Sequence, residues 1–262
     1  MTLFLLITLV LLTQVTFLWA LSVKLKDASI IDIYWGFGYV NVVGVCVLFN
    51  VFSAEYAYSS AQWLLAAIVS IWGMRLTLHL GRRNIGKGED YRYAAMRRSG
   101  GPKWWLQSYV TVYLLQMSLM LLICLPVYWV LSSPQAPELG KLELIATLLW
   151  LVGFFFESVG DYQLDQFKRN RRSSTQILDT GLWRYTRHPN YFGDALQWWA
   201  FFLFAVNIDG GWMTIISPII MTLFLVKVSG VALLEKGLQK TKPHYADYVS
   251  KTPAFIPWFP KP

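Results

Sequence analysis

The sequence has 262 residues, of which 55% are hydrophobic, 16% aromatic and 15% charged. A soluble domain usually carries about a quarter charged residues, so this composition excludes an ordinary soluble domain. The net charge of +8 would indicate nucleic-acid binding in a soluble protein. In so apolar a chain we expect instead an asymmetric membrane protein with no nucleic-acid partner. The two cysteines lie in apolar runs and are expected to be buried thiols. The three scattered histidines, without a Cys-x-x-Cys pair, argue against a metal site.

Seven apolar runs have about the 20 residues that a helix needs to span a bilayer. They cover residues 2–23, 29–50, 60–80, 104–131, 141–161, 190–208 and 211–234. We therefore predict an all-α, polytopic protein with a single integral membrane domain. Residues 1–131 hold helices one to four on the substrate side, and residues 141–262 hold helices five to seven and a cofactor-binding tail. The first run could be a signal peptide, but it exceeds the usual apolar core of about 7–15 residues, so we expect a retained helix.

Lys and Arg residues are distributed asymmetrically between the loops of this seven-span arrangement. The loops after runs one, three and five, together with the tail, hold 20 of the 23, and the opposite loops hold none. Because cytoplasmic loops carry the excess of positive charge, we expect the N-terminus outside and the C-terminus in the cytosol, in a bacterial inner membrane. The longest loops, 81–103 and 162–189, are too short for a βαβ nucleotide-binding domain. Any cofactor must therefore bind to the cytosolic face of the membrane domain itself.

Ionisable side chains in a span are costly and mark candidate functional sites. Asp32 opens the second helix, with Tyr34 two residues later. It is either a charge that caps the helix at the interface or an acid lining the mouth of a cavity. Tyr91 lies in the polar loop 86–93, which could equally attach the chain to anionic lipids.

Three carboxylates recur every four residues at the cytosolic end of the fifth helix: Glu157, Asp161 and Asp165. Such a stripe repels itself unless cations or hydrogen-bond donors face it. It is either a solvated face paired with Lys168, Arg169 and Arg172, or an acceptor for ligand hydroxyls or an amide while the arginines take phosphates. A dinucleotide presents both kinds of group, and Gln163 would belong to the same wall.

The segment 181–199 changes from a basic, polar loop to an apolar helix. The helix carries Asn190 and Asp194 on one face, one turn apart. Polar and aromatic groups surround its start: Arg184, Tyr185, Arg187, His188 and Tyr191. A set of cations and polar side chains at a helix start is a plausible binding site for an anionic ligand. In the tail, Glu235 closes the last helix. Tyr245 and Tyr248 lie either in the headgroup belt or over an adenine.

The sequence Gly181-Leu-Trp-Arg-Tyr-Thr-Arg-His-Pro-Asn-Tyr-Phe-Gly-Asp194 resembles the C-terminal signature of the steroid 5α-reductase superfamily. The likeness is closest to a poorly characterised, mainly bacterial and plant subgroup. Similar patterns stand at Asp32–Gly36, Asp161–Leu164, Phe167–Lys168 and Tyr245–Tyr248. Related signatures occur in sterol reductases and in isoprenylcysteine and phospholipid methyltransferases, so the motif indicates the superfamily rather than the reaction.

This resemblance implies a seven-helix reductase with NADPH bound at the cytosolic ends of the later helices. It implies that Asn190 and Asp194 hold the nicotinamide–ribose region and that Lys168 and nearby arginines take phosphates. The remaining nucleotide contacts that it implies come from the fifth helix and the tail: Glu157, Asp161, Glu235, Tyr245 and Tyr248. Steroid 5α-reductases polarise the substrate carbonyl with a Gln-Glu pair and a tyrosine, which have no counterpart in helices two and three here.

We therefore expect an NADPH-dependent reductase of a conjugated carbon–carbon double bond in a steroid-like or other lipid, with no protein partner implied. A hydrogen-bond donor must stabilise the developing enolate, and the candidates are Asp32, Tyr34 and Tyr91. The alternative is a membrane methyltransferase that uses S-adenosylmethionine, whose cofactor has no phosphates. A third hypothesis, a non-catalytic lipid-binding protein, explains neither the acid stripe nor Asp194.

Overall fold

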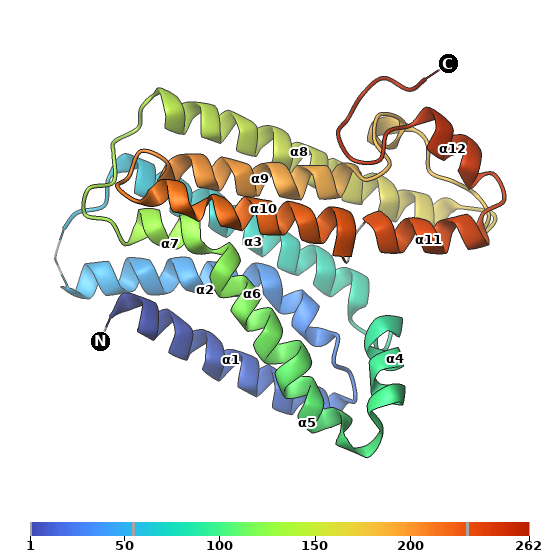
Figure 1. The fold of residues 1–262 in the computed structure, drawn as a ribbon, viewed down its shortest axis with the longest axis horizontal. Coiled ribbons are helices and arrows are strands. Elements are labelled where there is room, and N and C mark those ends of the chain that lie inside the picture. The colour runs from blue at the N-terminus through green and yellow to red at the C-terminus, as the bar shows by residue number, and fades with distance from the viewer. Residues whose placement is uncertain (1, 54–55, 229–230, 262) are drawn as a thin grey trace. The chain divides into compact units, whose positions relative to one another are not determined.

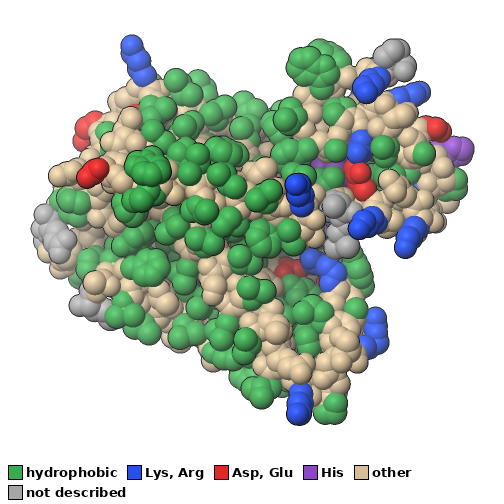
Figure 2. All heavy atoms as spheres, viewed as in Figure 1, with side chains coloured by type: hydrophobic (Ala, Val, Ile, Leu, Met, Phe, Trp, Pro, Cys, Tyr) green, Lys and Arg blue, Asp and Glu red, His purple; other side chains and the backbone are tan. Residues whose placement is uncertain are grey.

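The computed structural model describes residues 2–53, 56–228 and 231–261, and every regular element in these ranges is a helix. Six helical stretches there have the length and apolar composition to cross a bilayer: Leu3–Leu25, Ile30–Ser53, Ser60–Asn84, Tyr91–Ile123, Lys141–Asn170 and Gly211–Val228. Hydrophobic side chains dominate the face drawn in Figure 2. The predicted all-α, polytopic membrane fold is confirmed, and both cysteines are buried free thiols.

The seventh predicted span, residues 190–208, forms a shorter and more buried helix, α9 (Pro189–Ala205). Its 17 residues extend about 25 Å at 1.5 Å per residue, less than the apolar thickness of a bilayer of roughly 30 Å. Eleven of the 17 residues are buried, whereas at most 39% of each apolar stretch is. Among the described residues, six of the seven expected spans thus have the length and composition of a spanning helix, and the seventh, α9, is shorter and mostly covered by protein.

The chain divides into two compact units, and each is described here by itself. Unit 1 comprises Met1–Leu139 and Asn207–Gly211, and unit 2 comprises Gly140–Val206 and Trp212–Pro262. The main boundary between the units follows Leu139, and the short segment Asn207–Gly211 belongs to unit 1.

In unit 1, helices α2 and α3 make the closest packing. Along the chain this unit contains α1 (Leu3–Leu25), α2 (Ile30–Ser53), α3 (Ser60–Asn84), α4 (Tyr91–Gly100), α5 (Trp104–Ser108), the π-helical η2 (Tyr109–Leu114), α6 (Leu115–Ile123) and α7 (Leu125–Leu131). A Cβ on Gly73 would lie 2.5 Å from the carbonyl oxygen of Gly36. The two backbones can approach this closely only because neither residue carries a side chain.

Unit 2 is organised around the pair α8 and α9, which run side by side in Figure 1. Helix α8 spans Lys141–Asn170. The unit also contains η3 (Gly181–Arg184), α10 (Ile216–Leu223), η5 (Phe224–Val228), α11 (Val231–Thr241) and α12 (Tyr245–Lys251). A Cβ on Gly153 of α8 would lie 2.7 Å from the carbonyl oxygen of Gly193, so this crossing also depends on two glycines. It sets the acid stripe of α8 against the face of α9 that follows Asn190.

Candidate functional site

The acid stripe of α8 meets carboxamide side chains on α9. Asn190 Nδ2 donates to Asp161 Oδ1 at 2.9 Å, and Gln197 Nε2 donates to Glu157 Oε2 at 2.7 Å. Glu157 is 3% and Asp161 6% exposed, and buried carboxylates require such donors. The structure thus brings together Asp161 and Asn190, two predicted site residues. Gln197 was missed, although its place seven residues after Asn190 puts it on the same helix face.

Two carboxamide oxygens at the contact between α8 and α9 accept no hydrogen bond in the part of the chain that the structure describes: Asn190 Oδ1 and Gln197 Oε1. Leaving a buried acceptor unsatisfied costs roughly 1–3 kcal/mol. Asn190 is itself only half-buried at the start of α9, so its oxygen marks a place where a ligand N–H or O–H would be favourable. Asp194, one turn further along, is buried.

The loop before α9 is fastened to the C-terminal part of α8. Leu182 N donates to Gln163 Oε1 at 3.0 Å, and Trp183 Nε1 donates to Gly160 O at 3.1 Å. Gly181 has a φ of +63°, in the left-handed region that favours glycine. A Cβ on Gly181 would lie 2.7 Å from Gln163 Oε1, so any larger residue here would displace the Gln163 side chain that accepts from Leu182.

Buried Arg187 and His188 form an ionic cluster with the partly exposed Glu235. Arg187 donates from Nε and Nη2 to the two carboxylate oxygens of Glu235, at 2.7 and 3.1 Å. Its Nη1 donates to Val249 O at 3.2 Å and also to Thr252 O. His188 Nε2 lies 3.2 Å from Glu235 Oε1. Four of the five guanidinium N–H groups are therefore occupied within the protein. Arg187 thus connects α11 and α12, which belong to the C-terminal tail, to the residues just before α9.

The charge of Glu235 is maintained by its partners. Burial alone would raise the pKa of this carboxyl, but hydrogen bonds from His188 and Arg187, together with their charges, outweigh that effect. They lower the pKa of Glu235 from 4.5 to about 2. The carboxylate is thus ionised at neutral pH and can balance the guanidinium of Arg187.

Tyr245 and Tyr248 pack inside the tail rather than at its surface. Tyr248 Oη donates to Trp183 O, and the two tyrosine rings meet edge to face at 5.9 Å. Tyr245 is 2% exposed. Burial raises the pKa of Tyr245 to about 12 and also raises the pKa of Tyr248. Both hydroxyls therefore stay protonated and serve as hydrogen-bonding groups.

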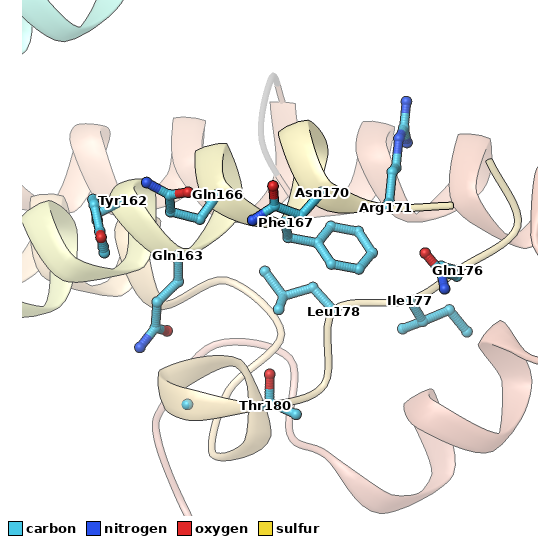
Figure 3. A pocket seen from close by; sticks show the side chains of 11 residues that line it. Tyr162, Gln163, Gln166, Phe167, Asn170, Arg171, Gln176, Ile177, Leu178 and Thr180 are labelled. Carbon is cyan, nitrogen blue, oxygen red and sulfur yellow. The ribbon is translucent and has the colours of Figure 1, made fainter. Parts of the chain in front are cut away.

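A pocket of about 520 Å³ lies between the end of α8 and the loop that follows it. We call it the amide pocket because four carboxamide side chains line it: Gln163, Gln166, Asn170 and Gln176. Figure 3 shows Phe167 and Leu178 between the helix and the loop. Arg171, the one cation in the lining, points away from the loop in this view. Apart from Arg171, the lining residues are uncharged and combine amides with apolar surface. The ammonium of Lys242 lies beside them, 5.8 Å from the centroid of the Phe167 ring.

A second pocket of about 690 Å³ adjoins the first and shares Ile177, Thr180 and Gly181 with it. We call it the basic pocket, since its lining includes the cations Arg184, Lys251 and Lys261 together with His244. Tyr248 also lines it, as do two acids, Asp179 and Asp247. Three fixed cations against two carboxylates make this pocket the more suitable of the two for an anionic group.

Asp32 lies in a polar network within unit 1. It accepts hydrogen bonds from Tyr93 Oη at 2.6 Å and from Arg92 Nη2 at 3.0 Å. Tyr93 Oη accepts in turn from Gln116 Nε2 at 2.9 Å, and Gln116 Oε1 accepts from Trp35 Nε1 at 2.7 Å. With a cation and a phenol facing it, Asp32 acts as an acceptor rather than a proton donor. Tyr93 was missed, although it ends the polar loop that drew attention to Tyr91.

The other two catalytic candidates are separate from this network. Tyr34 is 7% exposed and donates to Gln14 Oε1 on α1. Tyr91 is 66% exposed. The structure therefore does not bring Asp32, Tyr34 and Tyr91 together, and of the three it is Asp32 that contacts the buried hydroxyl of Tyr93.

The comparisons with known proteins identify a family. Residues 18–252 match the family described as "Protein of unknown function (DUF1295)". The chain belongs to the DUF1295 family. An uncharacterized protein of Schizosaccharomyces pombe (strain 972) is 26% identical to it over 265 residues, which cover 92% of this chain and 75% of that protein. No solved structure matches.

In this DUF1295 chain the expected cofactor residues occupy three kinds of position. Arg187, His188 and Glu235 form the ionic cluster, whereas Arg184 lines the basic pocket and Gln163 the amide pocket. The side chains of Lys168 and Arg172 are exposed and line neither pocket. Two tyrosines have aromatic neighbours: Tyr185 lies edge to face against Phe259, and Tyr191 stacks on His188. Lys251, a further cation of the basic pocket, was not among the cofactor residues expected from the sequence.

Proposed function

We propose that this DUF1295 protein is an NADPH-dependent reductase of a conjugated carbon–carbon double bond in a lipid that enters from the bilayer. One support is the resemblance of residues 181–194 to the steroid 5α-reductase signature. The observation that carries the proposal is the adjacency of a basic pocket and an amide pocket around the loop that starts this segment.

The groups in these pockets suit a dinucleotide phosphate. Arg184, Lys251 and Lys261 supply cations for phosphates. The amide pocket supplies donors and acceptors for the polar edges of a base or sugar, and Phe167 supplies an apolar ring beside them. The buried oxygen of Asn190 accepts from a ligand hydroxyl or carboxamide. When bound, NADPH supplies the hydride for the reduction.

The remaining residues of unit 2 hold these groups in place. Arg187 and Glu235 fix the tail on the loop, and the tail carries Lys251 and Lys261 into the basic pocket. We therefore assign phosphate binding to Arg184 in place of Arg187, whose guanidinium is occupied. A fixed set of donors costs little reorganisation when a ligand binds.

The hydrogen-bond donor for the substrate carbonyl is assigned to Tyr93 in place of Asp32, Tyr34 or Tyr91. Its hydroxyl is buried and held between Asp32 and Gln116. Asp32, whose two oxygens accept from Tyr93 and Arg92, can orient the phenol, which exchanges Asp32 for the carbonyl oxygen as its acceptor. A donor placed against the developing enolate oxygen is the largest stabilisation that such a site supplies.

One observation favours the second candidate, a methyltransferase that uses S-adenosylmethionine. The amide pocket is neutral apart from Arg171, whose guanidinium points away from the loop. The adenosine group of S-adenosylmethionine, which has no phosphates, would fit the amide pocket as well as the corresponding part of NADPH does. The basic pocket then has no role in cofactor binding, which separates the two hypotheses.

Thermal unfolding of the detergent-purified protein tests the proposal. A ligand present at 100 times its Kd stabilises the folded state by about 2.7 kcal/mol, so NADPH should raise the Tm clearly and S-adenosylmethionine should not. Arg184→Ala and Lys251→Ala should each reduce the NADPH shift. Lys240→Ala, which removes an exposed cation of α11 that lines neither pocket, should leave it unchanged. A shift with S-adenosylmethionine and none with NADPH would sink the reductase proposal.

A further inference from the structure

The C-terminal tail presents three exposed apolar side chains within four residues. Ile256, Trp258 and Phe259 are 68, 71 and 73% exposed. Single exposed hydrophobic residues are ordinary on any protein surface. A contiguous group with two large aromatic rings usually marks a surface that contacts another apolar phase.

The tail holds these side chains in place through its backbone. Trp258 N donates to Tyr185 O, and Lys261 N donates to Lys251 O, both at 2.9 Å. The Phe259 ring lies edge to face against Tyr185 at 6.0 Å between centroids. The outward direction of these rings is thus fixed by contacts with the loop before α9.

Helix α8 sets the depth at which this loop, and hence the tail, lies. The loop is attached to α8 through hydrogen bonds at Gly160 and Gln163. Here α8 changes from an apolar run ending near Phe156 to a polar segment that contains Asp161 and Asp165. A spanning helix leaves the hydrocarbon at such a change, so the tail lies at the height of the lipid headgroups.

The charge of the surrounding chain suits an anionic lipid surface. Five lysines lie in residues 231–261: Lys236, Lys240, Lys242, Lys251 and Lys261. The two acids of the same segment are Glu235, which is neutralised by Arg187, and Asp247. Aromatic rings at headgroup level with lysines beside them are the pattern of an interfacial segment.

We propose that Ile256, Trp258 and Phe259 form an interfacial anchor that inserts into the anionic leaflet at the C-terminal end of α8. Lys236 and Lys240, both exposed on α11, contact headgroup phosphates while the rings enter the boundary with the acyl chains. Pro260 and Lys261 follow directly and line the basic pocket, so the anchor holds one wall of that pocket at the membrane surface. The anchor does not depend on the identity of the pocket's ligand.

Spin labelling in nanodiscs that hold a single copy of the chain tests this anchor. The label is attached at Phe259→Cys in a background of Cys46→Ala and Cys124→Ala, with Ile256→Cys as a second site. A matched control carries it at Ser174→Cys, an exposed residue of the loop that follows the polar end of α8. In discs with anionic lipid, the label at either tail site should collide more often with oxygen than with a water-soluble nickel chelate. The control should show the opposite preference.

Three results would overturn the proposal or a part of it. Nickel accessibility at the tail sites equal to that of the control would show that the tail lies in water. Shielding from both reagents would show that protein, and not lipid, covers these residues. Equal immersion in purely zwitterionic discs would remove the role assigned to the lysines.

Discussion

Arg187 and Glu235 form a two-pronged ion pair between the start of α9 and α11, with Nε–Oε1 and Nη2–Oε2 distances of 2.7 and 3.1 Å. The side chains are 8 and 15% exposed, respectively. Because the residues are 48 positions apart, their pairing closes the C-terminal part of the chain into one structure. His188 makes a further contact with the same carboxylate.

Removing the charge of Glu235 should destabilise unit 2. Glu235→Gln leaves Arg187 buried without a counter-ion, and breaking a buried pair in this way costs about 3–5 kcal/mol. Since Glu235 retains some exposure, we expect a loss at about the lower figure, on the order of 3 kcal/mol, seen as a lower Tm in detergent. Lys236→Gln, on the exposed neighbour in the same helix, is the control. Equal Tm values for the two variants would show that the ion pair contributes nothing.

The same pair predicts a pH dependence. The pKa of Glu235 is lowered from 4.5 to about 2, so its stabilising contribution is fully present above the unfolded value and is lost as the pH falls through the folded value. The difference in Tm between the native protein and Glu235→Gln should be constant from neutral pH to about pH 5. It should then shrink as the pH approaches 2. A difference that grows on acidification would contradict this assignment.

The contact between α8 and α9 depends on two glycines that face each other. A Cβ on Gly193 would overlap the backbone of Gly153 and of Glu157. Gly193→Ala should therefore separate the helices and break the hydrogen bonds of the acid stripe. We expect a clearly lower Tm and a loss of any ligand-induced shift. Gly237→Ala on α11 meets open space and should leave stability unchanged or raise it by about 0.5–1 kcal/mol. Equal Tm values for Gly193→Ala and Gly237→Ala would show that the contact between α8 and α9 has room for a side chain at Gly193.

Much of unit 2 was predictable from spacing alone. Carboxylates every four residues on α8 required facing donors, and the amide of Asn190 at the next helix start supplies one. The identity of the neighbours was harder to predict. The apolar run of α9 is compatible with either lipid or protein around it, and only the burial of 11 of its 17 residues shows that protein covers most of it. Likewise, a basic residue such as Arg187 gives no sign of whether a ligand or a carboxylate of the same chain neutralises it.

Unit 1 was less predictable because its polar contacts join residues far apart in the chain. Asp32 and Tyr93 are 61 positions apart, and neither has a periodic partner that would indicate the pairing. The sequence drew attention to Tyr91, which lies on the outward side of the same segment. Two residues along a helix turn the side chain by about 200° at 3.6 residues per turn, so Tyr93 faces the interior where Tyr91 cannot.

Tyr93 and Tyr91 therefore provide a matched pair for testing the polar network. Tyr93→Phe removes the hydrogen bond to Asp32 and leaves Gln116 Nε2 without its acceptor. Hydrogen bonds between membrane helices contribute about 0.6 kcal/mol on average and at most about 1.7. We expect a Tm decrease of corresponding size for Tyr93→Phe and none for Tyr91→Phe.

Combining Tyr93→Phe with Asp32→Asn shows whether the two residues act together. If Tyr93 and Asp32 stabilise the protein through their shared hydrogen bond, the double variant should lose less stability than the sum of the single variants. The coupling should be of the order of 1 kcal/mol, as expected for one hydrogen bond. Reductase activity, once a substrate is found, should fall with Tyr93→Phe and not with Tyr91→Phe. Strictly additive stability effects, or activity lost only in Tyr91→Phe, would remove Tyr93 from its assigned role.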